Sequence, residues 1–285
     1  MSGCDTSGCD TSDRVHAIGF HFKTTILLVL TSSIGVVAFA WPLIAAPDSA
    51  AMAHATDAPL VFAILIPLLL GIVLTAFREG GLDAKSLAML GVLAAVIAVL
   101  RPLGAGTAGL EPIWVVLILG GRALGPGFGF ALGSVGLFAS ALLTGGVGPW
   151  LPFQMLAASW VGLGAGLLPA IRGKREIAVL AAYGAVASFI YGLLINLWFW
   201  PFTTNLAEGI AFLPGAPLGE NLLAWVRFTL VTSLGFDIPR AALTAALIAI
   251  AGRPILFTLR RMATKANFSP HVEFTPSAPH GTLLP

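Results

Sequence analysis

Residues 120–152 read GGRALGPGFGFALGSVGLFASALLTGGVGPWLP, and Gly121, Gly125, Gly129 and Gly133 recur at every fourth position of this apolar stretch. Four-residue spacing places the glycines on one face of a helix, where they form a groove. Such a groove lets helix backbones approach closely in lipid, where burying Leu against Leu gains little. A merely well-packed span would explain the glycines, but not the Gly/Pro/Trp turn that ends the stretch. Residues 120–152 therefore predict a polytopic membrane bundle with a structured external loop.

Composition places the chain among integral membrane proteins. Of its 285 residues, 57% are hydrophobic and 10% are charged, whereas ordinary soluble domains are about 25% charged. The net charge of +2 is spread over many short loops, so no nucleic-acid-binding surface is predicted. Cys4 and Cys9 lie in a tandem Ser-Gly-Cys-Asp-Thr repeat, within a polar tail that we expect to be disordered. A metal or disulfide role for this pair is the alternative, although no His or further Cys completes a site.

Apolar runs of about 20 residues are long enough to cross a bilayer as helices. The piece at 111–121 covers only about half of the hydrocarbon thickness, so it is predicted to be a short or tilted span. The segment Leu222 to Leu234 is predicted to be a half-span or an interfacial helix. The first span is longer than a signal-peptide core and another span follows it, so an uncleaved anchor is expected. The predicted full spans are 24–46, 59–77, 86–102, 122–144, 151–169, 176–200 and 238–259.

The positions of Lys and Arg orient the predicted bundle. With a cytoplasmic N-terminus, all but three of the 15 Lys and Arg residues fall in inside segments, and the exceptions are Arg101, Arg227 and Arg240. Cytoplasmic loops of membrane proteins carry this excess of positive charge. Both termini are therefore predicted to lie in the cytoplasm and the chain in the cell membrane.

The expected spans hold no acidic residue or histidine near their centres, where ion-driven carriers and proton pumps usually place such groups. The chain also has no phosphate-binding loop and no catalytic or metal-ligand constellation. We therefore expect no enzyme activity, no cofactor and no metal, and we expect another subunit to supply the energy for uphill transport. The five histidines lie in tails or in an external loop: His16, His21, His54, His271 and His280.

From residue 86 to 261 the order of elements resembles the substrate-binding S component of energy-coupling factor (ECF) vitamin transporters. The amino-acid sequences of residues 143–154 and 196–201 are similar to those of actinobacterial family members assigned to cobalamin. The pieces that carry the resemblance are an alanine-rich helix at 87–100, Glu111-Pro-Ile-Trp, G-R-x-L-G-P-x-x-G-x-x-x-G from Gly121 to Gly133, the turn at 145–154, and the small residues Ala158, Gly162, Gly166 and Ala170.

The resemblance implies an all-α fold with a six-helix S-component-like domain at 86–261. The sequence adds two transmembrane helices at 24–85, either a peripheral pair or part of a partner interface, and disordered cytoplasmic tails at 1–23 and 262–285. The implied function is the vitamin-binding membrane subunit of an ECF-type importer, with cobalamin favoured over riboflavin and thiamine. The implied partners are a membrane-embedded coupling (T) subunit and two cytoplasmic ATPase subunits.

In that family the first core helix contacts the coupling subunit through an A-x-x-x-A pattern. Ala94 and Ala98 have this spacing and are the expected docking residues, although the same spacing recurs at 84/88 and 241/245. Two other functions stay open. An ion-coupled secondary transporter would need the Gly/Pro-broken region at 145–152 as its coupling site. A membrane assembly factor would need further polar residues on the cytoplasmic face.

Polar and aromatic side chains gather at the predicted outer ends of the helices. Aromatic rings with a few amides suit a vitamin, whereas an aromatic belt at the lipid interface is the alternative. The amides of Gln154 and Asn196 need a partner in an apolar zone, either the ligand or a neighbouring helix. Glu111 is expected to contact the ligand or to cap a helix. The remaining candidates for substrate binding are Trp150, Phe153, Trp160, Trp198 and Trp200, with Tyr191 nearby.

Overall fold

The computed structural model describes residues 22–44, 71, 84–104, 108–203 and 205–266, and this part of the chain contains helices and turns without a strand. The predicted span at 59–77, apart from Gly71, and nearly all of both predicted tails lie outside these residues. The elements are α1 (Phe22–Ile44), α5 (Ala84–Leu100), η1 (Arg101–Gly104), α6 (Ile113–Leu124), α7 (Pro126–Thr144), α8 (Leu151–Leu167), α9 (Lys174–Phe199), η2 (Trp200–Phe202), α10 (Leu218–Thr232) and α11 (Leu234–Ala266).

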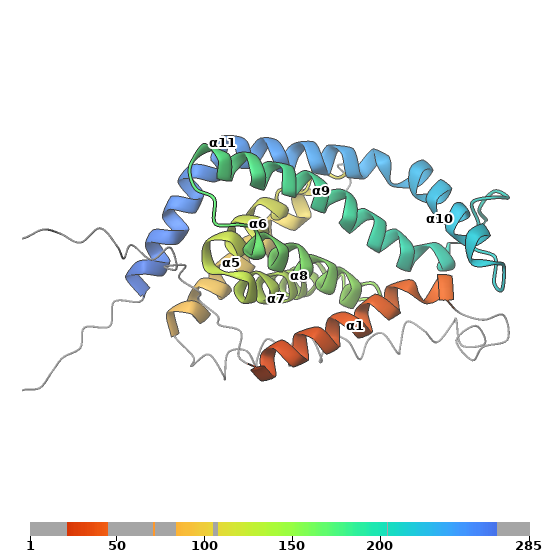
Figure 1. The fold of residues 1–285 in the computed structure, drawn as a ribbon, viewed down its shortest axis with the longest axis horizontal. Coiled ribbons are helices and arrows are strands. Elements are labelled where there is room, and N and C mark those ends of the chain that lie inside the picture. Colours follow the sequence, from red (N-terminus) through yellow and green to blue (C-terminus); the bar gives the residue numbers. More distant parts are fainter. Residues whose placement is uncertain (1–21, 45–70, 72–83, 105–107, 204, 267–285) are drawn as a thin grey trace, which may run out of the picture.

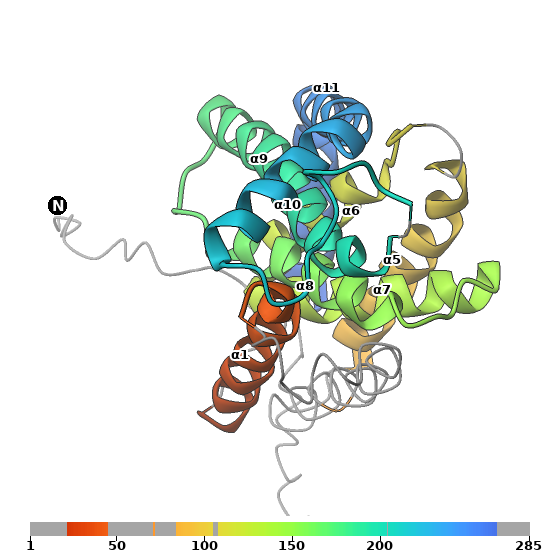
Figure 2. The same ribbon diagram turned by 90° about the vertical axis from the view of Figure 1, so that its right-hand side faces the viewer.

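Six helices, α5 to α9 and α11, pack into one bundle, with the most extensive contacts between α7 and α8 and between α9 and α11. Figure 1 shows α9 and α11 side by side along one side of the bundle and α1 on the opposite side. The short helix α10 lies across one end, which faces the viewer in Figure 2. We call this the α10 end, and the opposite end, where α9 begins, the Glu176 end.

Within the described residues, five helices are long and apolar enough to cross a membrane, so the predicted all-α, polytopic membrane fold is confirmed. These five lie at Thr25–Leu43, Ala84–Gly104, Pro126–Thr144, Lys174–Phe202 and Leu234–Thr264. The predicted short span corresponds to α6, whose 12 residues extend about 18 Å. The segment predicted as a half-span or interfacial helix is the 15-residue α10.

Two predicted helix boundaries were wrong. The span predicted from 122 to 144 is broken at Gly125, whose φ of 100° ends α6. Pro126 then begins α7, because proline lacks the N–H that would continue α6 and is favoured in a first helical turn. Arg122 therefore belongs to α6. The last helix begins at Leu234, before the predicted residue 238.

Helix α11 has 33 residues, about 50 Å of helix, which is longer than a hydrocarbon core of about 30 Å. Its C-terminal part bends away from the line of the rest (Figure 1). Pro254 lies inside this helix, and proline removes one helical hydrogen bond and is a common cause of a bend.

Three glycines bring α6, α7 and α8 into backbone contact. A Cβ atom on Gly121 of α6 or on Gly129 of α7 would overlap the carbonyl oxygen of Gly162 in α8. Further along the same interface, Gly133 approaches the backbone of Ser159, and Gly166 lies against the backbone of Pro126. Small residues therefore set the closest approaches in the bundle, whereas Gly125 serves the turn instead.

Helix α1 packs against α8, α9 and α10. The indole Nε1 of Trp160 donates a hydrogen bond to Ser32 Oγ at 3.0 Å. The ring of Phe39 is fully buried between Phe153 and Trp160, with centroid distances of 5.0 and 5.9 Å. The first of the two additional helices is therefore part of the packed structure.

Candidate functional site

A buried chain of ion pairs lies at the α10 end. Arg240, in the second turn of α11, donates from Nη1 to Asp237 Oδ1 at 2.6 Å and from Nε to Glu111 Oε2 at 3.1 Å. The side chains of Arg240 and Asp237 are 9% and 2% exposed. Asp237 also accepts from Ser233 Oγ at 2.7 Å, and Glu111 accepts from Trp114 Nε1 at 2.8 Å. Two carboxylates thus share the Arg240 guanidinium.

Local packing makes room for this cluster. A Cβ atom on Gly192 of α9 would overlap the carboxylate of Asp237, so only glycine admits the acid there. Gly109 has a φ of 90°, and its Cα lies against the carbonyl of Phe236, where a side chain would clash. This contact holds the loop before α6 against α11 and brings Glu111 to Arg240.

The larger cavity at this end has a volume of about 290 Å³. Its polar lining includes Asp237, Arg240 and Asn196, and its aromatic lining comprises Tyr191, Phe199, Phe228 and Phe236. The Arg240 guanidinium lies 5.3 Å from the centre of the Tyr191 ring. The Nδ2 atom of Asn196 is buried and has no hydrogen-bond partner among the described residues.

A smaller cavity of about 240 Å³ is lined by Arg101, Glu111, Ser140 and Trp150, together with small residues of the adjoining loops. Arg101 is held in place by Gln154, whose Oε1 accepts from Arg101 Nη2 at 2.6 Å. Ser140 is fully buried, and its Oγ has no partner among the described residues. Because Glu111 lines this cavity and pairs with Arg240 of the larger one, their ion pair links the two.

The structure brings four of the predicted site residues to these cavities. Asn196 lines the larger cavity, and Glu111 and Trp150 line the smaller one. Trp150 is 41% exposed and donates to the carbonyl of Gly146 at 3.3 Å. Gln154 acts through Arg101 and does not itself line a cavity.

The other four predicted residues pack elsewhere. Phe153 is fully buried against Phe39 and against Trp198, whose ring centre is 5.3 Å away. Trp160 is bonded to α1, as described above, and Trp200 Nε1 donates to the carbonyl of Ile210 at 2.7 Å. None of these four lines either cavity.

Four site residues were not predicted from the sequence: Arg101, Ser140, Asp237 and Arg240. The positions of Asp237 and Arg240 do contain a signal, because residues three apart on a helix are neighbours. That signal was lost when the start of α11 was predicted after Asp237. Arg101 could be recognised from the sequence only as a positively charged residue at the outer end of a predicted helix, with no indication that it lines a cavity.

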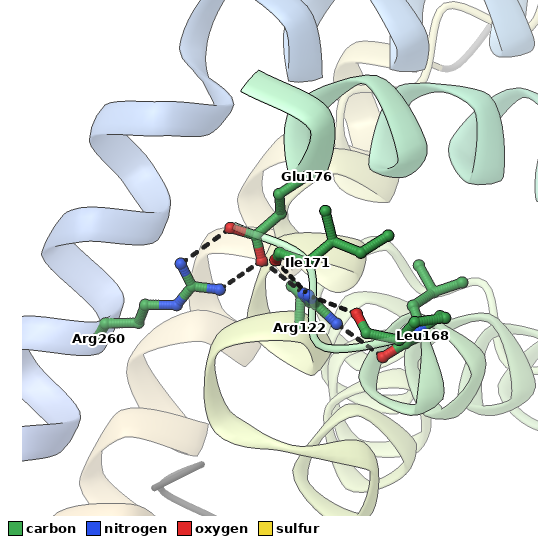
Figure 3. Close-up of polar contacts among 6 residues, drawn as sticks. Arg122, Leu168, Ile171, Glu176 and Arg260 are labelled. Atoms are coloured by element: carbon green, nitrogen blue, oxygen red, sulfur yellow. Dashed lines mark hydrogen bonds and ion pairs between the residues drawn. The ribbon is translucent and has the colours of Figure 1, made fainter. Parts of the chain in front are cut away.

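A second buried ion-pair cluster lies at the Glu176 end (Figure 3). Arg122 of α6 donates from Nε to Glu176 Oε1 at 2.7 Å. Its two other nitrogens donate to carbonyl oxygens of the turn between α8 and α9, at Leu168, Pro169 and Ile171. Arg260 of α11 donates to both carboxylate oxygens of Glu176. This cluster therefore joins three helices and one turn.

Comparison with known proteins gives one match. A family model described as "ECF transporter, substrate-specific component" matches residues 85–252. The matched span starts in the first turn of α5 and ends within α11, so it includes both cavities and excludes α1. Searches of the curated proteins and of the solved structures found no match.

Proposed function

Because the chain belongs to the substrate-specific component family of ECF transporters, we propose that its substrate binds in the two cavities at the α10 end. Proteins of this family are substrate-binding transport subunits and not enzymes. The observation that carries the proposal is a pair of buried polar atoms with no hydrogen-bond partner among the described residues, Asn196 Nδ2 and Ser140 Oγ, one in a lining residue of each cavity. An unmade buried hydrogen bond costs about 1–3 kcal/mol, so a ligand that completes both bonds gains affinity.

The cavity volumes support a small vitamin. Pockets for drug-sized ligands usually measure about 300–1,000 Å³, and the larger cavity here, at about 290 Å³, is at the lower limit. Cobalamin, which the sequence resemblance at residues 143–154 and 196–201 favours, is a corrin macrocycle much larger than thiamine or riboflavin. The larger cavity also combines four aromatic rings with the Asp237–Arg240 ion pair. We therefore rank thiamine and riboflavin ahead of cobalamin.

Calorimetric titration of the purified full-length protein tests this proposal. The ligands are thiamine, riboflavin, cobalamin and biotin. We expect one small vitamin to saturate a single site. Saturable binding of cobalamin alone would overturn the size argument. Failure of a folded sample to bind any of the four would count against a vitamin site in these cavities.

Asn196→Ala is expected to weaken binding of that vitamin by about 1–3 kcal/mol, because the ligand loses a buried hydrogen bond. Trp198→Phe is the matched control. It also deletes a buried, unpartnered N–H two residues further along α9, but Trp198 lines neither cavity. Calorimetric affinities of the two variants should differ by that amount. Equal affinities would remove Asn196 from the site.

We propose that the α10 end faces the outside and the Glu176 end faces the cytoplasm. The support is the charge asymmetry: Arg172, Lys174 and Arg175 precede or begin α9, and Arg260 and Arg261 lie near the end of α11. In contrast, the α10 end carries Arg101, Arg227 and Arg240 among the described residues, and Arg240 is neutralised by Asp237 and Glu111. A membrane-impermeant thiol reagent applied to cells should label a cysteine at Glu208 but not one at Lys174. The reverse pattern would invert the orientation.

The family implies association with a coupling subunit and ATPase subunits, and we propose that α5 provides a docking face. The expected docking residues Ala94 and Ala98 are only 3% and 6% exposed, because they pack into the core. An adjacent face of α5 is exposed among the described residues and is small at Ala88, Gly91 and Ala95. A Cβ atom at Gly91 would meet no atom of the described residues beyond its own helix within 4 Å. This face, and not the Ala94/Ala98 face, allows a partner helix to approach.

Ala88→Leu combined with Ala95→Leu is expected to reduce uptake by the assembled transporter while leaving vitamin affinity unchanged, since the added side chains hold a partner helix away. The matched control, Ala94→Leu with Ala98→Leu, overpacks the core and should lower the melting temperature instead. Uptake in vesicles, calorimetry and thermal unfolding separate the two effects. Normal uptake by the Ala88/Ala95 variant would exclude the exposed face.

A further inference from the structure

The Glu176 end contains a basic cavity of about 530 Å³ between the start of α9 and the last turns of α11. Four arginines and one acid line it: Arg172, Arg253, Arg260, Arg261 and Glu176. Glu176 is already neutralised, because it binds both Arg122 and Arg260. No ion pair is found for the other three lining arginines within the described residues. The cavity thus has an uncompensated positive charge.

The backbone adds to this charge. Gly173, which lines the cavity, is the N-terminal cap of α9 with a φ of 77°, and no side chain caps the helix there. The first amide groups of a helix lack intrahelical partners and carry its positive dipole end. An anion in the cavity would therefore meet arginine side chains and the start of a 26-residue helix.

One wall of the cavity is apolar and continues onto the outside of the bundle. Ile177, Leu256 and Phe257 form it, and Phe257 is 67% exposed. On a helix that spans a membrane, such an exposed apolar side chain faces acyl chains. Arg261 lies near the end of the same helix, where lipid headgroups are expected. A free phosphate ion would make no use of this wall, and an acidic protein segment would not need it.

We propose that this cavity binds the phosphate of an anionic phospholipid headgroup, with the acyl chains along the Phe257 wall. Basic pockets between transmembrane helices bind such headgroups through arginine and the acyl chains through apolar residues. The site is separate from the substrate cavities, so it is tested without a vitamin.

The test uses native mass spectrometry of the purified full-length protein with dioctanoyl phosphatidylglycerol as probe and dioctanoyl phosphatidylcholine as the neutral comparison. We expect phosphatidylglycerol to bind in preference to phosphatidylcholine. Arg253→Gln with Arg261→Gln should weaken phosphatidylglycerol binding by about fivefold for each arginine removed. Lys174→Gln with Arg175→Gln is the matched control, because it removes the same charge at the same end from residues that do not line the cavity. The control should bind like the unmodified protein.

Four results would overturn the proposal. Equal binding of both lipids would exclude recognition of an anion. Equal weakening in both double variants would reduce the effect to general surface charge. Competition by millimolar inorganic phosphate as strong as that by added phosphatidylglycerol would make free phosphate the ligand. Normal lipid binding by the Arg253/Arg261 variant, together with loss of its partner subunits during purification, would assign the cavity to a protein.

Discussion

Replacing Arg122 by alanine is expected to lower the free energy of unfolding by about 3–5 kcal/mol, the cost of leaving one member of a buried ion pair without its partner. The loss is large for two reasons. Glu176 is almost fully buried and keeps only Arg260, and three carbonyl oxygens of the turn between α8 and α9 lose the hydrogen bonds that Arg122 donates. Unfolding of the protein in bicelles by added SDS would measure the change.

Two further variants distinguish the roles of Arg122. Arg122→Lys retains the charge, but lysine cannot reproduce the planar fork that reaches a carboxylate and several carbonyls, so most of the loss should remain. Glu176→Gln removes the ion pair while leaving the carbonyl contacts of Arg122, and should cost less than Arg122→Ala. A lysine variant as stable as the unmodified protein would show that charge alone matters.

Arg240→Leu is expected to have a comparable cost of about 3–5 kcal/mol, because Asp237 would be left as a buried charge without a cation. Binding of the vitamin should also be lost, since the guanidinium lines the larger cavity and links it to the smaller one. Unfolding in bicelles and calorimetric titration report the two effects separately.

A rescue experiment separates folding from binding at this cluster. Adding Asp237→Asn and Glu111→Gln to Arg240→Leu removes the unpaired charges, and buried ion-pair networks can be replaced by neutral residues with little loss of stability. The triple variant should therefore regain much of the lost stability but not the affinity for the vitamin. Recovery of full affinity would mean that the ion-pair cluster serves the fold alone.

Much of the fold could be predicted because hydrophobic length and Lys/Arg placement are local signals. Helices α1, α5, α8 and α9 lie within a few residues of the predicted spans, and the short α6 was recognised from its length. The break at Gly125 was missed because both flanking segments are apolar, and the glycine was assigned to the groove and not to a turn. The start of α11 was missed because Asp237 and Arg240 look like loop residues until each supplies the partner that makes burial of the other possible.

The candidate site could be predicted only in part. Asn196, Glu111 and Trp150 stood out because polar or amphipathic groups near helix ends are few. The tryptophans at 160 and 200 could not be distinguished from packing residues, because their partners come from distant segments: Ser32 in α1 and the carbonyl of Ile210. Arg240 could not be predicted as a site residue, because its partners come together only through close packing at Gly109 and Gly192. These glycines hold the loop before α6 and helix α9 against α11.

The docking of α1 has a consequence for how the molecule can be shortened. The family match begins at residue 85, yet Phe39 and Thr31 of α1 are each only 1% exposed, like Leu117 and Leu156 of the six-helix bundle. A truncated version starting at α5 would expose the ring of Phe153 and strip Trp160 of its hydrogen-bond acceptor. The region matched by the family and the packed structure therefore have different N-terminal limits, and an expression version that starts at residue 85 would leave the rings of Phe153 and Trp160 on α8 without their contacts to α1.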